Sequence, residues 1–345
     1  MTQTPTITVL ISAYNSEQYL TEAVESILLQ TETDFECLLL DDGSSDGTWQ
    51  LMQSLAKQDH RVNIHQNPKN IGLTQTLNRG LKMARGRFIA RLDADDVALP
   101  QRLALQRHYL ENTPHIDVVG GGIACFIDEQ STPLAKPPER PTIDPWMIDW
   151  QTRLRSVMIH PAVMFRKQVI LELGGYDSNY TYSQDFELWG RPALQGRMSN
   201  LSESVIQSRQ IASQISLKHK QTQQQLAYTI GQRNLTPYWP SNTPPTLEEI
   251  ERLRFLTQFI PQTYNPKDFH LALMLIQSFQ HFCRAHPGPT HVMKQARHKL
   301  ATQLLSIIPL SQLHDAWQVG LLPALFKLAP MPCMRLGLNR MLKRF

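Results

Sequence analysis

The stretch RFIARLDADDVALP, residues 87–100, joins an apolar run to three aspartates and then closes with a proline. Its apolar part, residues 87–92, has the composition of a buried strand. Asp93, Asp95 and Asp96 follow directly, so three carboxylates gather where this strand ends. Carboxylates this close repel one another unless a cation or a hydrogen-bond donor lies between them. The stretch therefore predicts a central strand with a charged site at its end.

Strand-like and helical segments alternate around this stretch. Residues 7–14, 35–40 and 62–66 read as strands, and helical patterns follow each of them at 15–30, 49–58 and 73–86. Asn15 is placed as the N-cap of the first helix. A helix from Pro100 comes next, and then a fifth strand over residues 116–128, whose three glycines predict a bulge or close packing. This order predicts an α/β fold with a Rossmann-like, mainly parallel sheet.

The second part of the chain has a different texture. The Pro-rich residues 131–146 predict a surface loop, residues 161–167 a strand, and residue 184 the start of a helix. After a Pro-rich connector at residues 234–249 the pattern is helical. We expect one domain over residues 1–205, a helix or linker over 206–245 and a helical region over 246–345.

Composition and charge narrow the class of protein. The hydrophobic content of 41% is ordinary for a globular chain. No apolar run approaches the roughly 18 to 20 residues of a membrane span, and the first residues lack the basic start of a signal peptide, so we expect a cytoplasmic protein. Residues 1–202 hold 18 Lys and Arg against 24 Asp and Glu, a net charge of −6, whereas residues 203–345 hold 16 against 6, a net charge of +10. The cysteines are far apart, which indicates neither a disulfide framework nor a zinc site: Cys37, Cys125, Cys283 and Cys333.

Polar clusters follow three of the predicted strands, at residues 12–15, 41–42 and 93–96. Ligands of open α/β sheets bind beyond the carboxyl ends of the strands, where the loops diverge. Taken alone, the aspartates of residues 41–46 would be turn formers and a helix cap, and those of residues 93–96 a solvated loop. Their joint placement favours a site for Mg²⁺ or Mn²⁺ and a phosphate-bearing substrate, since these hard ions take oxygen ligands.

Five ordered motifs carry a family resemblance. VLISAYNSEQYLTEAVESILLQT, FECLLLDDGSSDGT, NIGLTQTLNRGLKMARGRFIARLDADD and HPAVMFRK, followed by GGYD and QDFELWGR, resemble an inverting family-2 glycosyltransferase with the A-type nucleotide-sugar fold (GT-A). The resemblance covers about residues 5–205. It implies an enzyme that moves a sugar from a nucleotide-diphosphate sugar with the help of Mn²⁺ or Mg²⁺.

The resemblance also assigns roles on the donor side of the site. It implies that Tyr14 stacks on the nucleobase and that Asp42 accepts a hydrogen bond from it. The other residues implied on the base, phosphate and ribose side are Ser12, Ala13, Asn15, Asn70 and Arg79. Asp93-Ala94-Asp95 matches the DxD element, with Asp93 towards the ribose and Asp95 towards the metal and diphosphate, and Asp96 is a further candidate metal ligand.

Asp185 matches the aspartate to which the family assigns the role of general base. Such a base takes the proton of the attacking hydroxyl, which contributes roughly 10² to 10⁴ in rate. The family usually has Glu-Asp here, whereas this chain has Gln184-Asp185, which removes a like charge that would raise the pKa of Asp185. Without the other motifs, Asp185 would read as a helix cap. Tyr176 is expected near the acceptor side, and His160 is a candidate pocket residue.

The expected reaction is transfer of a single sugar from a nucleotide-diphosphate sugar, with a UDP-sugar as the expected donor, to a glycan or lipid-linked acceptor in cell-surface polysaccharide or lipopolysaccharide synthesis. Two alternatives stay open. A non-catalytic sugar-nucleotide or glycan-binding protein is suggested by Gln184, and a nucleotidyltransferase would also use an acidic metal site, although the chain lacks a Gly-rich, lysine-bearing phosphate loop near its start.

The last fifteen residues, 331–345, interleave apolar and basic side chains. This composition suits an interfacial helix on anionic lipid, which would bring peripheral contact with the inner face of the membrane. It equally suits a helix docked on a bundle with a solvated basic face, and both readings stay open. No nucleic-acid-binding motif accompanies the basic charge, so we expect no nucleic-acid partner.

Overall fold

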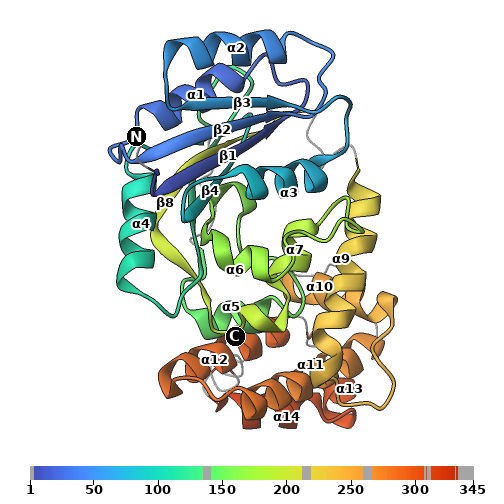
Figure 1. Cartoon of the computed structure of the whole chain (residues 1–345). Coiled ribbons are helices and arrows are strands. Elements are labelled where there is room, and N and C mark those ends of the chain that lie inside the picture. The colour runs from blue at the N-terminus through green and yellow to red at the C-terminus, as the bar shows by residue number, and fades with distance from the viewer. Residues whose placement is uncertain are drawn as a thin grey trace. The chain divides into compact units, whose positions relative to one another are not determined.

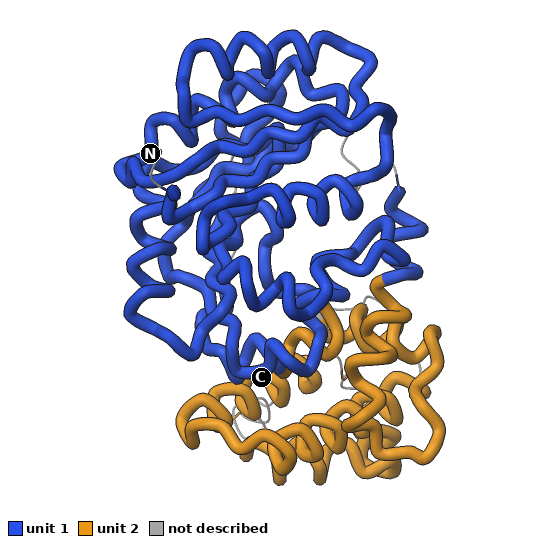
Figure 2. Tube along the Cα trace, in the orientation of Figure 1, with its two compact units in different colours: residues 1–149, 156–226 blue, residues 150–155, 227–345 orange. Residues whose placement is uncertain are grey.

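The computed structural model describes residues 4–134, 141–211, 219–258, 266–306 and 312–330, together with residues 308 and 332. The chain forms two compact units. Residues 1–149 and 156–226 form unit 1, and residues 150–155 and 227–345 form unit 2 (Figure 2). The chain therefore contributes to unit 2 twice, first with a short excursion and then with its last part.

Unit 1 is built on one eight-stranded sheet (Figure 1). In chain order its strands are β1 (Ile7–Ala13), β2 (Phe35–Asp41), β3 (Val62–Gln66), β4 (Phe88–Asp93), β5 (Val97–Ala98), β6 (Val118–Ile127), β7 (Met164–Arg166) and β8 (Met198–Arg209). They lie in the order β3-β2-β1-β4-β7-β6-β8-β5. The first four are parallel, β7 is antiparallel to β4 and β6, and β6 is parallel to β8. The predicted α/β class is confirmed.

Helices cover both faces of this sheet, because the buried strands present apolar side chains alternately to each side. In β1, Ile7, Val9 and Ile11 pack on one side with helices α1 (Leu20–Leu28), α2 (Thr48–Gln58) and α4 (Arg102–Asn112). Leu10 packs on the other side, where helices α3 (Leu73–Met83), α6 (Lys167–Glu172) and α7 (Gln184–Trp189) lie. Unit 1 thus has three layers, with the sheet between two layers of helices.

Strand β8 was not predicted, and it crosses the domain boundary expected at residue 205. Residues 206–209 belong to this strand and not to a helix or linker. Its sequence, MSNLSESVIQSR, lacks a clear strand pattern because polar side chains such as Ser199 and Asn200 are buried and hydrogen-bonded to backbone groups far along the chain. Ser199 Oγ donates to the carbonyl of Ile143 at 2.7 Å, and Asn200 Nδ2 donates to the carbonyl of Thr142 at 2.7 Å. Hydropathy alone could not identify a strand whose polar groups have such partners.

Smaller differences concern the ends of elements. Helix α1 begins at Leu20 and not at residue 16, so Asn15 does not cap it; Asn15 has a positive φ of 50° in the preceding loop. Other helices and strands were also not predicted, among them β5, α6, and α5 (Pro145–Gln151) at the end of the expected surface loop. The glycines of β6 do mark an irregularity, since the β6–β8 register shifts on both sides of Gly122. Residues 135–140 of that loop lie outside the described residues.

Unit 2 is helical where the structure describes it. Helix α9 (Lys220–Leu235) crosses the division at residue 226, and α10 (Leu247–Gln258), α11 (Pro266–Ala285), α12 (Thr290–Ser306), α13 (Leu313–Gln318) and α14 (Leu321–Leu328) follow. Trp150, from the short excursion, packs edge-on against Phe279 with ring centroids 4.9 Å apart. The basic segment expected at residues 331–345 lies outside the described residues, apart from residue 332.

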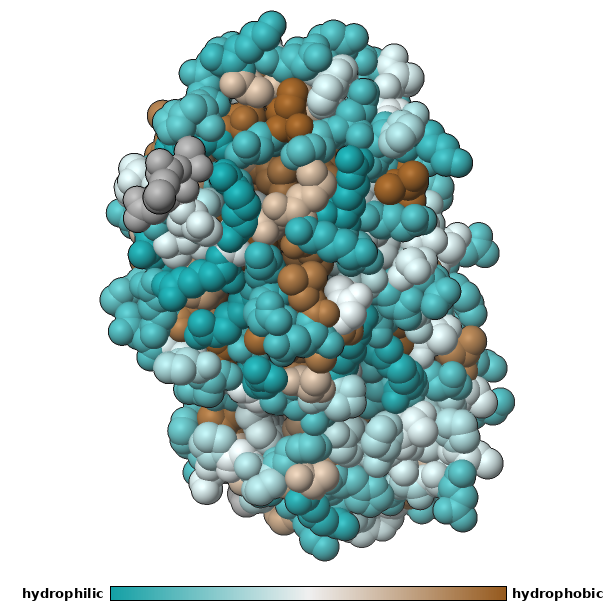
Figure 3. Space-filling model, in the orientation of Figure 1, coloured by the Kyte–Doolittle hydropathy of each residue, from teal (hydrophilic) through white to brown (hydrophobic). Residues whose placement is uncertain are grey.

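None of the described helices is both long enough and apolar enough to span a membrane. The face drawn in Figure 3 is predominantly hydrophilic. Polar and charged side chains cover most of this face, and a band of apolar side chains is exposed in its upper middle (Figure 3).

A close backbone approach at Gly86 positions β4. A Cβ atom at this position would lie 2.4 Å from the backbone nitrogen of Thr8 and 2.6 Å from the carbonyl carbon of Ile7. Because backbone atoms cannot rotate away, we expect Gly86→Ala to lower the free energy of unfolding by about 1–3 kcal/mol. Urea denaturation measures the change. Gly231→Ala is the control: its nearest neighbour, 3.0 Å away, is the side-chain methyl of Ile250, and an equal loss there would contradict the steric argument.

Candidate functional site

The carboxyl ends of β1, β2 and β4 meet at one edge of the sheet. In the strand register, Ala13 lies beside Asp41, and Ser12 lies between Leu40 and Asp93. The three polar clusters identified in the sequence are therefore brought together. Loops that leave a parallel sheet at this edge diverge around a ligand site in open α/β folds.

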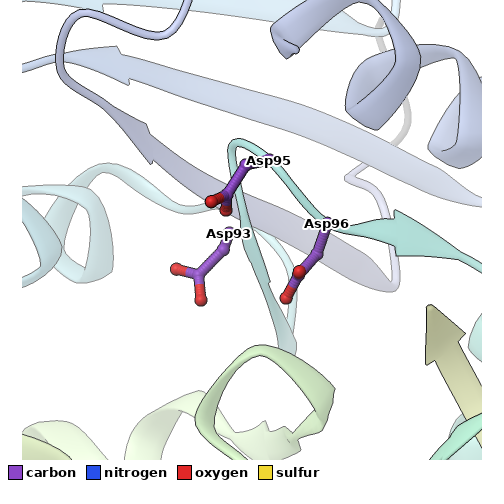
Figure 4. A group of neighbouring side chains, drawn as sticks. All are labelled: Asp93, Asp95 and Asp96. Carbon is purple, nitrogen blue, oxygen red and sulfur yellow. The ribbon is translucent and has the colours of Figure 1, made fainter. Parts of the chain in front are cut away.

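Three carboxylates lie at the end of β4 and directly after it (Figure 4). Residues 93–96, which carry them, are called the aspartate turn below. Asp93, Asp95 and Asp96 each offer one oxygen atom, and these oxygens all lie within 4.8 Å of one another. In the residues that the structure describes, this is the one group of three or more acidic, His or Cys side chains so arranged. Oxygen donors at this spacing fit a hard divalent cation such as Mg²⁺ or Mn²⁺.

In the absence of a cation, the ionised forms of Asp95 and Asp96 are unfavourable. Burial, and then the charge of Asp93, raise the pKa of Asp95 to about 6. Burial raises the pKa of Asp96 well above its usual range, with Asp93 and Asp95 adding to the effect. A bound divalent cation would favour the charged forms of both carboxyl groups. The residues present therefore fit a metal ion, on electrostatic as well as geometric grounds.

Two of the three carboxylates are tied to the surrounding protein. Asp93 Oδ1 lies 2.5 Å from Nη2 of Arg91, whose side chain is 1% exposed. Nε and Nη1 of Arg91 have no hydrogen-bond partner within the described residues. Asp96 Oδ1 accepts the backbone N–H of Arg209 at 2.9 Å. Asp95 thus has the carboxylate that is most available to a cation.

Asp185 lies in the first turn of α7, which begins after Ser183 in a left-handed conformation with φ of 59°. Burial raises the pKa of Asp185, the negative charge of Asp93 adds to the rise, and Arg91 opposes it. The candidate base is thus within electrostatic reach of the carboxylates at the end of β4. The neighbouring Gln184 is buried and adds no charge, so burial, and not the residue before Asp185, dominates its pKa.

Tyr176 and His160 lie beneath this part of the site. The Tyr176 hydroxyl and His160 Nε2 are 2.9 Å apart, and Tyr176 is only 2% exposed. Burial lowers the pKa of His160 well below its usual range and raises that of Tyr176. The imidazole is therefore neutral, and the tautomer of His160 decides which of the two groups donates. Tyr176, expected near the acceptor side, is buried in this structure, and its partner His160 packs on Trp189 of α7.

Asp42 organises the loop between β3 and α3. One of its carboxylate oxygens accepts from Asn67 Nδ2 at 2.7 Å and from the N–H of Ile71 at 3.0 Å, and the other accepts from the N–H of Gly72 at 2.9 Å. Each carboxylate oxygen can accept two hydrogen bonds, so the second oxygen keeps one acceptor position. Asn67, which the sequence analysis did not identify, is the side chain that holds the Asp42 carboxylate in place through this hydrogen bond.

The remaining candidates on this side lie around the same loops. Tyr14 is 50% exposed, which leaves a face of its ring open for stacking, and Asn70 is also exposed. Asn15 joins the loops after β1 and β2, because its Oδ1 accepts the N–H of Ser45 at 2.9 Å. Arg79 donates to Asn67 Oδ1 and to the carbonyl of Gln66. Ala94 is buried within the aspartate turn.

The raised pKa of Asp95 makes stability depend on pH. An unfolded aspartate has a pKa near 4, so the folded chain holds this proton more tightly, and stability falls as the pH rises from about 4 to about 6. In metal-free protein at pH 7.5 we expect Asp95→Asn to raise the Tm, and the gain to shrink towards pH 4. Thermal unfolding at both pH values measures this. A lower Tm at pH 7.5 would mean that Asp95 is not destabilised by its neighbours.

Comparison with known proteins agrees with this geometry. The family model for glycosyl transferase family 2 matches residues 8–174. The O-antigen biosynthesis glycosyltransferase WbnJ of Escherichia coli is 31% identical over 212 residues, which cover 59% of this chain and 79% of WbnJ.

Two solved structures share the fold. TarS 1–349 from S. aureus, in complex with UDP-GlcNAc, has a TM-score of 0.54 at 16% identity, over 91% of this chain and 90% of that one. The mannosyltransferase PcManGT from Pyrobaculum calidifontis, in complex with GDP-Man and Mn²⁺, has a TM-score of 0.52 at 14% identity, over 96% and 88%. At these identities the likeness supports the fold alone. The family model and the relative together show that the chain belongs to glycosyltransferase family 2.

Proposed function

We propose that this glycosyltransferase moves a single sugar from a nucleotide-diphosphate sugar to a glycan or lipid-linked acceptor, with inversion and with a divalent cation. The observation that carries the proposal is the placement of Asp93, Asp95 and Asp96 at the same sheet edge as the nucleotide-side loops, within electrostatic reach of Asp185. A charged donor site and a candidate base therefore adjoin one another.

The three aspartates would hold the cation, with Asp95 as the ligand most available to it. A bound Mn²⁺ or Mg²⁺ supplies neutralisation of the charge that develops on the departing diphosphate. Support comes from the raised pKa values of Asp95 and Asp96, which mark carboxyl groups that lack a counter-charge. PcManGT, which shares the fold, was solved with GDP-Man and Mn²⁺.

Asp185 would act as the general base. The acceptor hydroxyl oxygen forms a bond to the anomeric carbon while the bond from that carbon to the diphosphate oxygen breaks, and the hydroxyl proton passes to the carboxylate of Asp185. Attack on the face opposite the leaving group inverts the anomeric configuration. The raised pKa of Asp185 supports this role, because a base works best when its pKa approaches the working pH.

On the donor side, exposed Tyr14 would stack on the base, and Asp42 would accept from it through its remaining acceptor position. Ser12, Ala13, Asn70 and Arg79 would line the rest of the nucleotide. A UDP-sugar is the proposed donor class; TarS was solved with UDP-GlcNAc. Because WbnJ belongs to O-antigen biosynthesis, we propose a cell-surface polysaccharide or lipopolysaccharide acceptor, reached at the cytoplasmic face of the membrane through the basic C-terminal part.

The decisive experiment is donor hydrolysis. Purified protein with Mn²⁺ is given UDP-, GDP- and dTDP-sugars, and released nucleoside diphosphate is measured. We expect slow release from one donor, lost in Asp95→Ala and on removal of the metal with a chelator. Release of pyrophosphate would indicate a nucleotidyltransferase, and metal-dependent donor binding without turnover on any acceptor would indicate a binding protein.

Asp185→Asn separates binding from chemistry. We expect it to retain donor affinity while lowering the transfer rate by roughly 10²- to 10⁴-fold, because only proton removal is lost. Since the pKa of Asp185 is raised, the wild-type kcat should fall as the pH drops through that pKa, where the base becomes protonated. A kcat that is independent of pH from 5 to 8, or an active Asp185→Asn variant, would exclude Asp185 as the base.

A further inference from the structure

Arg209, the last residue of β8, joins four parts of unit 1 around the aspartate turn. Its buried guanidinium donates from Nε to the carbonyl of Asp95 at 2.9 Å, and from Nη1 to the carbonyl of Asp128 at 2.7 Å and to Ser131 Oγ at 3.1 Å. Nη2 lies 2.5 Å from Glu22 Oε2 on α1. One side chain thus links β8, α1, the turn at residues 128–131 and the backbone of the aspartate turn.

The backbone of the same residue fixes a second point of the turn. The N–H of Arg209 donates to Asp96 Oδ1 at 2.9 Å, and the adjacent residues of β8 pair with β5, which directly follows the aspartates. The ring of Tyr19 covers the guanidinium, with Cζ 4.7 Å from the ring centroid. The side chain of Arg209 donates its hydrogen bond to the backbone carbonyl of Asp95 and not to its carboxylate. The carboxylate of Asp95 therefore stays available to another ligand.

We propose that Arg209 is a positioning residue for the divalent-cation site, and that Glu22 acts through it. The inference rests on the proposed function in one respect, namely that the aspartates hold a divalent cation. Three carboxylates within 4.8 Å repel one another, so a turn without fixed support would relax and spread them apart. Groups that orient metal ligands affect affinity although they never touch the ion.

Glu22 gives the inference a test that spares the fold. Its side chain is 43% exposed, so water screens part of its charge, and glutamine keeps its size and hydrogen-bonding oxygen. Its partner, however, is a buried arginine that holds the turn. Loss of the Glu22 charge should therefore change the cation site more than it changes the Tm.

The experiment measures the Kd for Mn²⁺ by electron paramagnetic resonance, with UDP present and then with GDP present, and no acceptor. We expect Arg209→Lys to weaken Mn²⁺ binding about 10- to 100-fold, because an ammonium cannot reproduce the forked contacts. Glu22→Gln should weaken binding in the same direction by a smaller factor. The double variant should be no weaker than Arg209→Lys alone, since Glu22, which also accepts from Ser131 Oγ, reaches the backbone of Asp95 through that arginine.

Two matched controls separate positioning from general stability. Arg166 likewise donates to two backbone carbonyls, those of Ile116 and Leu110, and pairs with Asp117, but it lies away from the aspartate turn. Glu32, whose side chain is 16% exposed, pairs with Arg107 at 3.0 Å. We expect Arg166→Lys to lower the Tm without changing the Kd for Mn²⁺, and Glu32→Gln to leave that Kd unchanged.

A second readout needs no metal. Hydrogen exchange in peptides that cover residues 93–98 should accelerate in metal-free Arg209→Lys and remain as in wild type in Arg166→Lys. Wild-type affinity for Mn²⁺ in both Arg209→Lys and Glu22→Gln would overturn the positioning role and leave the proposed function standing. If wild-type protein binds no Mn²⁺ with either nucleotide, the metal site and the positioning role fail together.

Discussion

Asp93, Asp95 and Asp96 bring three carboxylate oxygens within 4.8 Å of one another, and their mutual repulsion is the constraint around which the site is organised. A cluster of like charges at the end of a buried strand is unfavourable unless donors and cations surround it. Buried polar groups of unit 1 supply such donors. Arg91 lies against Asp93, and β8 supplies donors to Asp96 and to the turn. The fold thus holds in place a group that would otherwise disperse, which is the expected cost of a preformed cation site.

The sequence predicts the parallel half of the sheet well, because its strands are buried on both faces and read as continuous apolar runs between turn signals. The apolar runs of β1, β2 and β4 are typical of buried strands. The antiparallel half is harder to predict. β8 carries Ser199 and Asn200, which donate to backbone carbonyls far along the chain, and β5 is a two-residue strand that pairs with β8. Such elements are made by tertiary contacts, which local patterns do not encode.

The same distinction applies to the site. The aspartates of the β4 turn are adjacent in sequence, and their chemistry is visible as a motif. The residues that hold these aspartates in place do not form a sequence motif. Arg209 and Glu22 are separated by 187 residues, and the Asn67 amide that holds Asp42 lies 25 residues from it. Arg91 could have been noticed as a charge within an apolar strand, but nothing in the sequence identifies which carboxylate it neutralises. The contact between the Tyr176 hydroxyl and His160, 16 residues apart, is likewise absent from any local pattern.

The short excursion of residues 150–155 has a consequence for how this protein could be divided. A fragment that ends at residue 226 would retain Trp150 but lose Phe279 and Phe282, the rings against which it packs. The strand-bearing part would then expose a large aromatic side chain, a feature that promotes aggregation. The helical part, expressed alone, would lack an aromatic residue of its own core. The two units are therefore interleaved along the chain, and recombination at a single junction cannot exchange one without damaging the other.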